Sequence, residues 1–269
     1  MPALATTAQT PALAPEPAVL VGTYRLTYQP DSTNPTTRTD IHYLLLGKTL
    51  SRFTSRATLA SDSLLAVFST LPFNQDNVSL MSDQLMKIPH SRFSYNIYKT
   101  AATHRLIYDD RIGLTHYRYE EPASFLTWVI TPDRASRAGY ACQRATTTFG
   151  GRQWEAWFTR EVPVSEGPYK FFGLPGLIVQ VADTRRYYVF ELLTLGKPTT
   201  ARLVALPAKA PPSTDRATFQ RALATYRLDP LASLSAASNG QMRITSLDPT
   251  SEQRARENAR KRNNPLELR

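Results

Sequence analysis

The chain is poor in cysteine, and Cys142 is the single example in 269 residues. One cysteine excludes an intrachain disulfide and leaves no CxxC pair, so cysteine content gives no indication of the compartment. Cys142 lies in the strand-like stretch GYACQRA, where a free thiol commonly packs as a small apolar side chain. No histidine lies near it in the sequence, so a catalytic thiol is not predicted.

Long apolar runs are also missing. None approaches the roughly 20 residues that a membrane-spanning helix needs, so we predict no transmembrane segment. The N-terminus is rich in Ala, Pro and Thr, and it lacks the basic and apolar regions of a complete signal peptide. Ala12-Leu13-Ala14 before Pro15 nevertheless resembles the end of such a peptide. Residues 1–19 are therefore either a disordered leader or the remnant of an export signal.

Glycine is scarce, yet six of the 11 glycines lie between Gly139 and Gly176. All three tryptophans, Trp128, Trp154 and Trp157, lie in or just before the same window. The 20 prolines argue against long uninterrupted helices, whereas 13 Tyr and 11 Phe suit the pleated surface of strands. The composition therefore favours a mainly β protein with a dense group of turns near its centre.

Acidic residues are outnumbered, because 32 Lys and Arg stand against 22 Asp and Glu and give a net charge of +10. Such a charge suits anionic partners such as acidic lipid or acidic glycan, although solubility alone accounts for a basic surface. The basic residues are mostly arginine and are spread along the chain. They lack the aromatic interleaving that is typical of RNA-binding sheets, so we expect no nucleic-acid partner.

The apolar pattern of the first half of the chain predicts strands and one helix. In Leu20–Tyr28 the alternation places Tyr24, Leu26 and Tyr28 on one face of a strand. The pattern loosens after Phe53 and is ambiguous over residues 72–90. The other elements expected before residue 131 are strands over Ile41–Leu46, Leu114–Glu120 and Trp128–Ile130, and a helix over Arg56–Phe68.

Three hairpins are expected from turn residues between strand-like runs. The clearest is at Gly150-Gly151, because glycine supplies the positive φ of a tight turn between GYACQRATTTF and QWEAWFT. Asp109-Asp110-Arg111 is interpreted as the turn before the strand with Leu114, His116 and Arg118 on one face. The other hairpins join Phe93–Tyr98 to His104–Tyr108, and LIVQV (177–181) to YYVFELL (187–193); Arg202–Leu206 is a candidate for a further strand.

The composition then shifts towards helix. Ser213 or Thr214 is placed to cap a helix over Arg216–Tyr226. A polar helix is expected over Glu252–Arg262, where opposite charges stand at i,i+4 spacing before Asn263-Asn264-Pro265.

The stretch GPYKFFGLPGLIVQV, residues 167–181, concentrates three glycines and two prolines before an apolar strand. Leu174-Pro175-Gly176-Leu177 fits a type II turn, because proline presets φ at the second position and glycine accepts a positive φ at the third. We interpret the stretch as a shaped bend that leads into a central strand. The alternative is an anion-binding nest of exposed amides around Gly173 and Gly176, which lacks the helix N-terminus that strengthens such sites.

These blocks together resemble the GLPGLI family of Bacteroidetes proteins, named for the motif that stands here as Gly173-Leu174-Pro175-Gly176-Leu177-Ile178. The series TWVI, GYACQRA, TFGGRQWEAWFTREVPVSEGPYKFFGLPGLI and YYVFELL is similar to the family's blocks. So are SRF near residue 52, YRYEEP near residue 119 and the closing NNPLEL. The resemblance spans about 20–269 and is densest over 128–195.

The resemblance implies a protein without an established activity that is exported to the periplasm or cell envelope. Residues 1–19 depart from the family pattern, because no full signal is visible. In the light of the resemblance we interpret them as an incomplete leader, with a cytoplasmic location as the alternative. The expected partners are an envelope protein or an anionic envelope ligand.

No established catalytic motif is present, since GxSxG, HExxH and GxGxxG are all missing. Gly47-Lys48-Thr49 resembles the end of a phosphate loop, but His42 stands where that loop requires glycine. Of the other histidines, His104 and His116 approach each other only across neighbouring strands. A metal site needs at least three converging ligands, for which Glu120 or Asp110 would be required, so we predict no metal and no cofactor.

Acidic pairs at Asp109-Asp110 and Glu120-Glu121 are expected to be solvated. Glu155, Glu161 and Glu166 lie beside the central motif, where a suitably spaced pair of carboxylates would permit glycoside hydrolysis.

The sequence thus predicts a mainly β (α+β) fold, a curved antiparallel sheet or partly open barrel of hairpins with a few helices, some of them C-terminal. One domain is expected over residues 20–269. The leading hypothesis is a non-enzymatic envelope protein that binds a ligand or partner in an apolar or aromatic groove near the central motif. The alternatives are a hydrolase of envelope peptide or glycan built on Glu155, Glu161 or Glu166, and a purely structural module. No catalytic residue is predicted, and a structural role is expected for the motif residues Gly150, Gly151, Arg152, Trp154, Trp157, Gly167, Pro168, Gly173, Leu174, Pro175, Gly176, Leu177 and Ile178.

Overall fold

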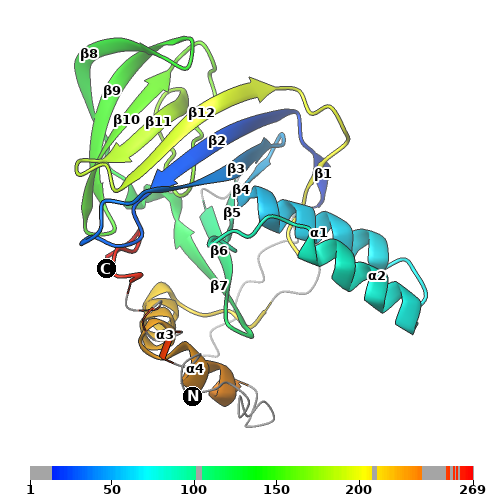
Figure 1. Cartoon of the computed structure of the whole chain (residues 1–269). Helices are drawn as coiled ribbons and strands as arrows, with labels where there is room; N and C mark the ends of the chain where they lie inside the picture. Colours follow the sequence, from blue (N-terminus) through cyan, green and yellow to red (C-terminus); the bar gives the residue numbers. More distant parts are fainter. Residues whose placement is uncertain are drawn as a thin grey trace, which may run out of the picture.

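The computed structural model describes residues 14–100, 105–207 and 211–237, and near the C-terminus residues 253, 254, 257, 259 and 261–268. Within these residues, eleven strands form one antiparallel sheet in the order β7-β6-β5-β4-β3-β2-β12-β11-β10-β9-β8. Figure 1 shows that this sheet curves strongly without closing. The mainly β fold with a curved antiparallel sheet is therefore confirmed.

Most neighbouring strands in the sheet are also consecutive in the sequence, so hairpins build it. The pair β2–β12 is the exception, because it joins the first half of the chain to the second. The strands of the sheet are β2 (Leu20–Tyr28), β3 (Arg38–Leu46), β4 (Leu50–Ser55), β5 (Asn96–Thr100), β6 (Arg105–Ile112), β7 (Thr115–Pro122), β8 (Val129–Arg137), β9 (Tyr140–Phe149), β10 (Arg152–Thr159), β11 (Leu177–Asp183) and β12 (Tyr188–Gly196).

Two pairs of helices flank the sheet (Figure 1). The helix α1 (Arg56–Phe68) packs on β3 and β4 and has the predicted bounds, while α2 (Gln75–Met86) fills the ambiguous region and packs on α1. The helix α3 (Arg216–Leu228), beside β6 and β7, was also predicted, and α4 (Pro230–Ala237) packs on it. A short 3-10 turn, η1 (Ala123–Phe125), follows β7.

The expected cap of α3 is wrong. Asp215 rather than Ser213 or Thr214 caps this helix, because its carboxylate accepts the Thr218 amide at 2.7 Å. Much of the polar helix expected over Glu252–Arg262 lies outside the described residues.

A two-stranded sheet joins β1 (Glu16–Pro17) to β13 (Leu203–Val204). Residues 16 and 17, which the sequence assigns to the leader, therefore pair with a strand of the fold. The Glu16 carboxylate also accepts the amides of Thr49 and Leu50, at 2.8 and 2.7 Å. Burial opposes ionisation of Glu16, but these bonds outweigh it and lower its pKa.

The inner face of the curved sheet holds the main core, which is strongly aromatic. The segment between β10 and β11 lies inside the curve and supplies Tyr169 and Phe171 to this core. The Phe171 ring centroid lies 4.6 Å from that of Trp154, and Tyr169 stacks near Phe190 at 6.4 Å. The three residues expected on one face of β2, Tyr24, Leu26 and Tyr28, are all buried in the same core.

The outer face of β3–β6 carries a second, smaller core. Leu45, Leu50, Tyr98 and Ile107 project from successive strands and are covered by Leu59 of α1 and residues of β13. Other positions on this outer face are polar, and they form the site described below.

One strand is not predicted from the sequence, and one turn assignment is wrong. No element is assigned to Leu50–Ser55, which forms the interior strand β4. Asp109-Asp110-Arg111 is not a turn but the middle of β6, which continues to Ile112. The sequence pattern fails at both places because the outer side of these strands is polar yet buried, so the alternation expected of a half-buried strand is disturbed. The strand expected over Trp128–Ile130 is longer, because β8 passes Pro132 with an irregular register.

Candidate functional site

The hairpin glycines of the central block form the tight turn between β9 and β10. Gly150 and Gly151 have φ of 58° and 76°, the values that a two-residue turn with positive φ at both positions requires. The Gly150 carbonyl accepts the Leu268 amide at 2.7 Å. The turn therefore also holds the C-terminal segment, residues 263–268.

Arg152 binds the same C-terminal segment from inside the protein. Its guanidinium donates to the Leu266 carbonyl at 3.1 Å, to the Pro265 carbonyl at 2.6 Å and to the Asn264 side chain at 2.5 Å. It also pairs with Asp183 at 3.0 Å. Arg152 is 7% exposed, so this contact ties the GGR and NNPLEL blocks of the sequence together in the core.

A buried ionic cluster stands beside this contact, and it unites the GPYKFF and NNPLEL blocks. The Lys170 ammonium is fully buried and lies 2.9 Å from the Glu267 carboxylate, 3.3 Å from Glu121 and 2.8 Å from the Tyr119 hydroxyl. Arg216 pairs with Glu267 at 2.6 Å. Burial opposes ionisation of Glu267, but the charges of Lys170 and Arg216 outweigh it and lower its pKa. Glu121 was expected to be solvated, and the structure corrects this.

The GLPGLI motif forms a close backbone contact with β10. Gly176 has φ of 150°, and a Cβ on it would lie 2.0 Å from the Thr159 carbonyl oxygen. The Gly176 amide donates to the Leu174 carbonyl at 2.8 Å, so the turn closes over three residues and not as the expected type II turn. Leu174, Leu177 and Ile178 are buried, and Pro175 is exposed.

The remaining motif residues have separate contacts. Trp154 is buried in the inner core, and Trp157 donates to Glu155 at 3.0 Å beneath the Arg137 guanidinium. The Gly167 carbonyl accepts the Lys99 ammonium at 2.9 Å, and the Pro168 carbonyl accepts the Phe171 amide at 3.0 Å.

Gly173 lines a cavity of about 610 Å³ near this block, the motif cleft, together with Phe172, Glu166 and the β3–β4 turn. This is the region where the sequence places a groove. Glu166 is engaged there, since its carboxylate lies 2.6 Å from the Lys99 ammonium and accepts the Ser51 hydroxyl at 2.7 Å. Burial lowers the pKa of Lys99, an effect that Glu166 opposes.

The acids proposed for a hydrolase are each bound elsewhere. Glu155 accepts the Trp157 indole, Glu161 accepts the Ala141 amide at 2.8 Å, and Glu166 pairs with Lys99. The structure therefore does not present them as a catalytic pair. Cys142 is 3% exposed, and burial raises the pKa of its thiol, in line with an unreactive side chain.

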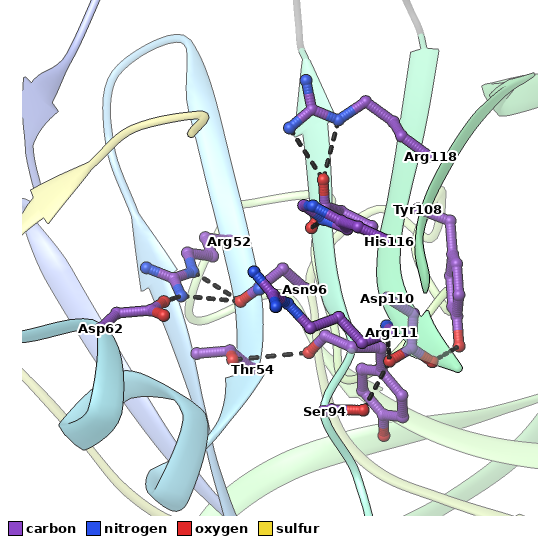
Figure 2. Close-up of polar contacts among 12 residues, drawn as sticks. Arg52, Thr54, Asp62, Ser94, Asn96, Tyr108, Asp110, Arg111, His116 and Arg118 are labelled. Carbon is purple, nitrogen blue, oxygen red and sulfur yellow. Dashed lines mark hydrogen bonds and ion pairs between the residues drawn. The ribbon is translucent and has the colours of Figure 1, made fainter. Parts of the chain in front are cut away.

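The largest cavity described here, about 1340 Å³, is a groove on the outer face of β4–β7. We call it the outer-face groove. Its walls are α1, residues 85–91 and residues 205–207 with 211 and 212, and they are largely apolar. Its floor consists of polar side chains from four neighbouring strands (Figure 2). The polar residues that line the groove at its floor, together with Asp62 of α1, are Arg52, Ser94, Asn96, Asp109, Asp110, Arg111 and His116.

Cross-strand pairing aligns these side chains. Asn96 stands opposite Asp109, and Asp109 stands opposite Arg118, so one row crosses β5, β6 and β7. Arg52 donates to the Asn96 side chain at 2.9 and 2.7 Å and pairs with Asp62 of α1. The row is thus held rigidly from β4 to β7 and to the helix.

Asp109 is the most deeply placed acid of the row, at 3% exposed. Its carboxylate lies 2.8 Å from His116 Nε2 and accepts Arg118 Nε at 2.8 Å. The face predicted for β7, with His116 and Arg118 together, is confirmed, whereas the expectation that Asp109 is solvated is wrong. No local pattern in the sequence indicates the Arg52–Asn96 contact, whose partners lie 44 residues apart.

Asp110 points to the opposite side of β6 and lies at the end of the groove. Its carboxylate accepts the Ser94 hydroxyl at 2.6 Å, the Arg111 amide at 2.8 Å and the Tyr108 hydroxyl at 3.1 Å. Burial nevertheless dominates and raises the pKa of Asp110 to about 6.

The floor contains an Asp–His pair, Asp109 with His116. An Asp–His pair acts as a general base when the imidazole reaches a nucleophile or substrate proton. In the described part of the chain, no serine, threonine or cysteine is hydrogen bonded to His116. The described residues also contain no group of three metal-binding side chains, and His104 of the considered metal site lies outside them.

A family model matches the central part of the chain. Residues 143–180 match the model of a family described as a protein of unknown function (Porph_ging). That match covers the β9–β10 hairpin, the segment inside the curve and the start of β11. No curated protein matches the sequence.

Solved structures resemble the fold. Two structures of PNGF-II, in space groups C2 and P21, align with TM-scores of 0.52 and 0.50 at 11% and 12% identity. Each alignment covers 78% of this chain and 33% or 34% of the PNGF-II chain, so the chain spans about a third of those proteins. At this identity the similarity concerns the fold alone. No helix in the described residues is long and apolar enough to cross a membrane.

Proposed function

We propose that this chain is an envelope protein of the GLPGLI type that binds a polar ligand in the outer-face groove without transforming it. The observation that carries the proposal is the floor of the groove. Neighbouring outer-face positions are filled by apolar side chains such as Leu45 and Ile107, which pack stably against α1 and β13. Arg52 and Asp109 stand on the same face and are equally buried.

Burying such charges is costly unless every one is paired, so packing alone does not favour them. Departures of this kind from an apolar interior are expected at functional sites. A cavity with apolar walls and a few fixed polar groups is also the usual form of a ligand site.

The charges of the floor indicate the kind of ligand. Arg52 and Arg111 line the groove with Asp62, Asp109 and Asp110, and Arg118, which lies outside the lining, pairs with Asp109, so the charges around the groove are close to balanced. The floor offers donors and acceptors alternately, which suits a neutral or zwitterionic ligand rich in hydrogen-bonding groups, such as a glycan or peptide fragment of the envelope. An anionic ligand, expected from the net charge, is not favoured at this place.

The motif residues are proposed to be structural. Gly150 and Arg152 hold the C-terminal segment, and Gly176 permits the contact with β10. The same contacts support a single domain over residues 20–269, because Asn264 at the end of the chain donates to Pro30 near its beginning. The location in the periplasm or envelope rests on the family resemblance, and cell fractionation tests it against the cytoplasmic alternative.

Two matched variants on α1 test the groove. Ser61 lines it, whereas Ser63 on the same helix is exposed and does not. We expect Ser61→Trp to fill the groove and Ser63→Trp to leave it open, with both proteins folded. Soluble peptidoglycan fragments and envelope oligosaccharides are then screened by thermal denaturation.

A ligand at about 100 times its Kd stabilises the native state by about 2.7 kcal/mol, which corresponds to a rise in Tm of roughly 5–10 °C. The rise should persist in Ser63→Trp and vanish in Ser61→Trp. An equal rise in both variants would place binding elsewhere. Mass spectrometry of the incubated fragments tests the hydrolase alternative, since products formed by the wild type and lost in His116→Gln would contradict a non-enzymatic role.

A further inference from the structure

A third and smaller cavity, of about 180 Å³, lies on the other side of the sheet, between β5–β6, α3 and the C-terminal segment. We call it the arginine cavity. Part of its lining is aromatic. Arg92, Arg227 and Arg262 line it from three different parts of the chain. Arg111 lines it as well, at the boundary with the outer-face groove.

Within the described part of the chain, these guanidinium groups lack a neutralising carboxylate. Among the described residues, none of Arg92, Arg227 and Arg262 forms an ion pair with a carboxylate. The Nη1 atom of Arg92 is buried without a hydrogen-bond partner in the described chain. An unpaired donor of this kind costs free energy, because it has lost its water without gaining an acceptor.

The arginines are also close enough to affect one another. Burial lowers the pKa of Arg92, and the charges of Arg262 and Arg227 lower it further. Burial likewise lowers the pKa of Arg227. Converging like charges are unfavourable in an empty cavity and become favourable when an anion lies between them.

The two acids that face the cavity do not supply that anion. Glu267 is already shared by Lys170 and Arg216 and accepts the Tyr169 hydroxyl. Asp110 is occupied by Ser94, Tyr108 and the backbone. Four guanidinium groups therefore line the cavity together with two carboxyl groups. One of these, Glu267, is already neutralised by Lys170 and Arg216.

The structure thus has an excess of positive charge around a small cavity, and we propose that the arginine cavity binds one tetrahedral oxyanion, a phosphate or sulfate group. Guanidinium groups match such oxygens by paired hydrogen bonds. A volume of about 180 Å³ leaves room for one such group together with water. The proposal does not depend on the ligand of the outer-face groove.

The test is a calorimetric titration of the full chain with inorganic phosphate and with sulfate, at constant ionic strength. We expect one saturable site. Arg227→Gln and Arg262→Gln should each weaken binding at least tenfold. Arg221→Gln is the matched control, because Arg221 lies on α3 like Arg227 but is exposed outside the cavity, and it removes the same charge. Absence of saturable binding, or an equal loss in Arg221→Gln, would overturn the proposal.

Asp110→Asn gives a second test that keeps all the arginines. Burial raises the pKa of Asp110 to about 6, so its negative charge grows above that pH and repels an anion. Sulfate does not titrate in this range, and we expect it to bind several-fold more tightly at pH 5 than at pH 7.5. Asp110→Asn should bind tightly at both, and a pH dependence that survives this substitution would contradict the assignment.

The source of the group is resolved by comparing three probes. Inorganic phosphate, glycerol phosphate and vesicles of anionic phospholipid share the same chemistry but differ in size. Arg262 is exposed at the cavity, so an ester should enter from that side. Binding of the ester or of vesicles that is lost in Arg227→Gln identifies a group on a larger molecule, and binding of phosphate alone identifies the free ion. Vesicle binding that is unchanged in Arg227→Gln would count against the site.

Discussion

The buried ammonium of Lys170 provides the sharpest test of the internal architecture. Lys170→Met keeps most of the side-chain volume but removes a charge that lies 2.9 Å from Glu267 and 3.3 Å from Glu121. Among the described residues, Arg216 then remains as the cation paired with both carboxylates, and the Tyr169 hydroxyl still donates to Glu267. Breaking a buried ion pair by removing one partner costs about 3–5 kcal/mol, because an uncompensated charge stays in the interior.

Equilibrium unfolding in urea at pH 7 measures this loss. With a slope of about 3 kcal/mol/M, the midpoint should fall by more than about 1 M. The double variant Lys170→Met/Glu267→Gln removes the opposite charge as well, so its loss should be smaller than the sum of the two single losses by at least about 1 kcal/mol. Additive losses, or a single loss below about 1 kcal/mol, would refute the reasoning.

The pH dependence of this cluster has a definite sign. The pKa of Glu267 is lowered in the folded state, so its contribution is present above the ordinary value of about 4.5 and is lost as the pH falls below it. The wild type should therefore lose stability below pH 4.5 more steeply than Glu267→Gln.

Three further predictions concern other sites. Gly176→Ala should destabilise by more than about 3 kcal/mol or prevent folding, because its Cβ would meet the Thr159 carbonyl at 2.0 Å; thermal denaturation measures it. Asp110→Asn should stabilise the protein by about 3 kcal/mol at pH 8 and by little at pH 4, since a raised pKa gives stability that is present below 3.8 and lost as the pH rises through about 6. Urea unfolding at both pH values checks this. Arg152→Met should release the C-terminal segment, seen as faster amide exchange at Leu266 and Leu268, and unchanged exchange there would contradict its role.

Local signals in the sequence were enough to predict much of the fold. The Gly150-Gly151 turn, the alternation of Leu20–Tyr28 and the helix over Arg56–Phe68 each depend on residues close together in the chain. Short-range geometry decides such elements, so a single sequence is sufficient for them.

The groove could not be predicted in this way. Asp109 and Arg52 are charged residues in buried strand positions, and their partners come from other strands or from α1. Only the strand order brings Asn96 between them. A polar pair such as Asp109-Asp110 reads as a turn until the sheet that buries it is known, and this is why the strand was placed wrongly.

The sequence predicts that the motif forms a bend, but it does not predict which residues the motif contacts. Gly176 was expected to satisfy a type II turn, whereas the approach of Thr159 from β10 is what excludes a side chain there. The link between Arg152 and Asn264, 112 residues apart, had no local signal apart from the co-occurrence of the two blocks.

The central claim is that the outer-face groove holds a polar ligand, and the most direct measurement is native mass spectrometry of protein recovered from its own host under mild conditions. Wild type, Ser61→Trp and Ser63→Trp are compared at equal purity. The account predicts a stoichiometric polar molecule retained by the wild type and Ser63→Trp and missing from Ser61→Trp. Retention of the same molecule by Ser61→Trp would contradict it. So would a wild-type protein that carries no such molecule and binds none of the envelope fragments when these are added back.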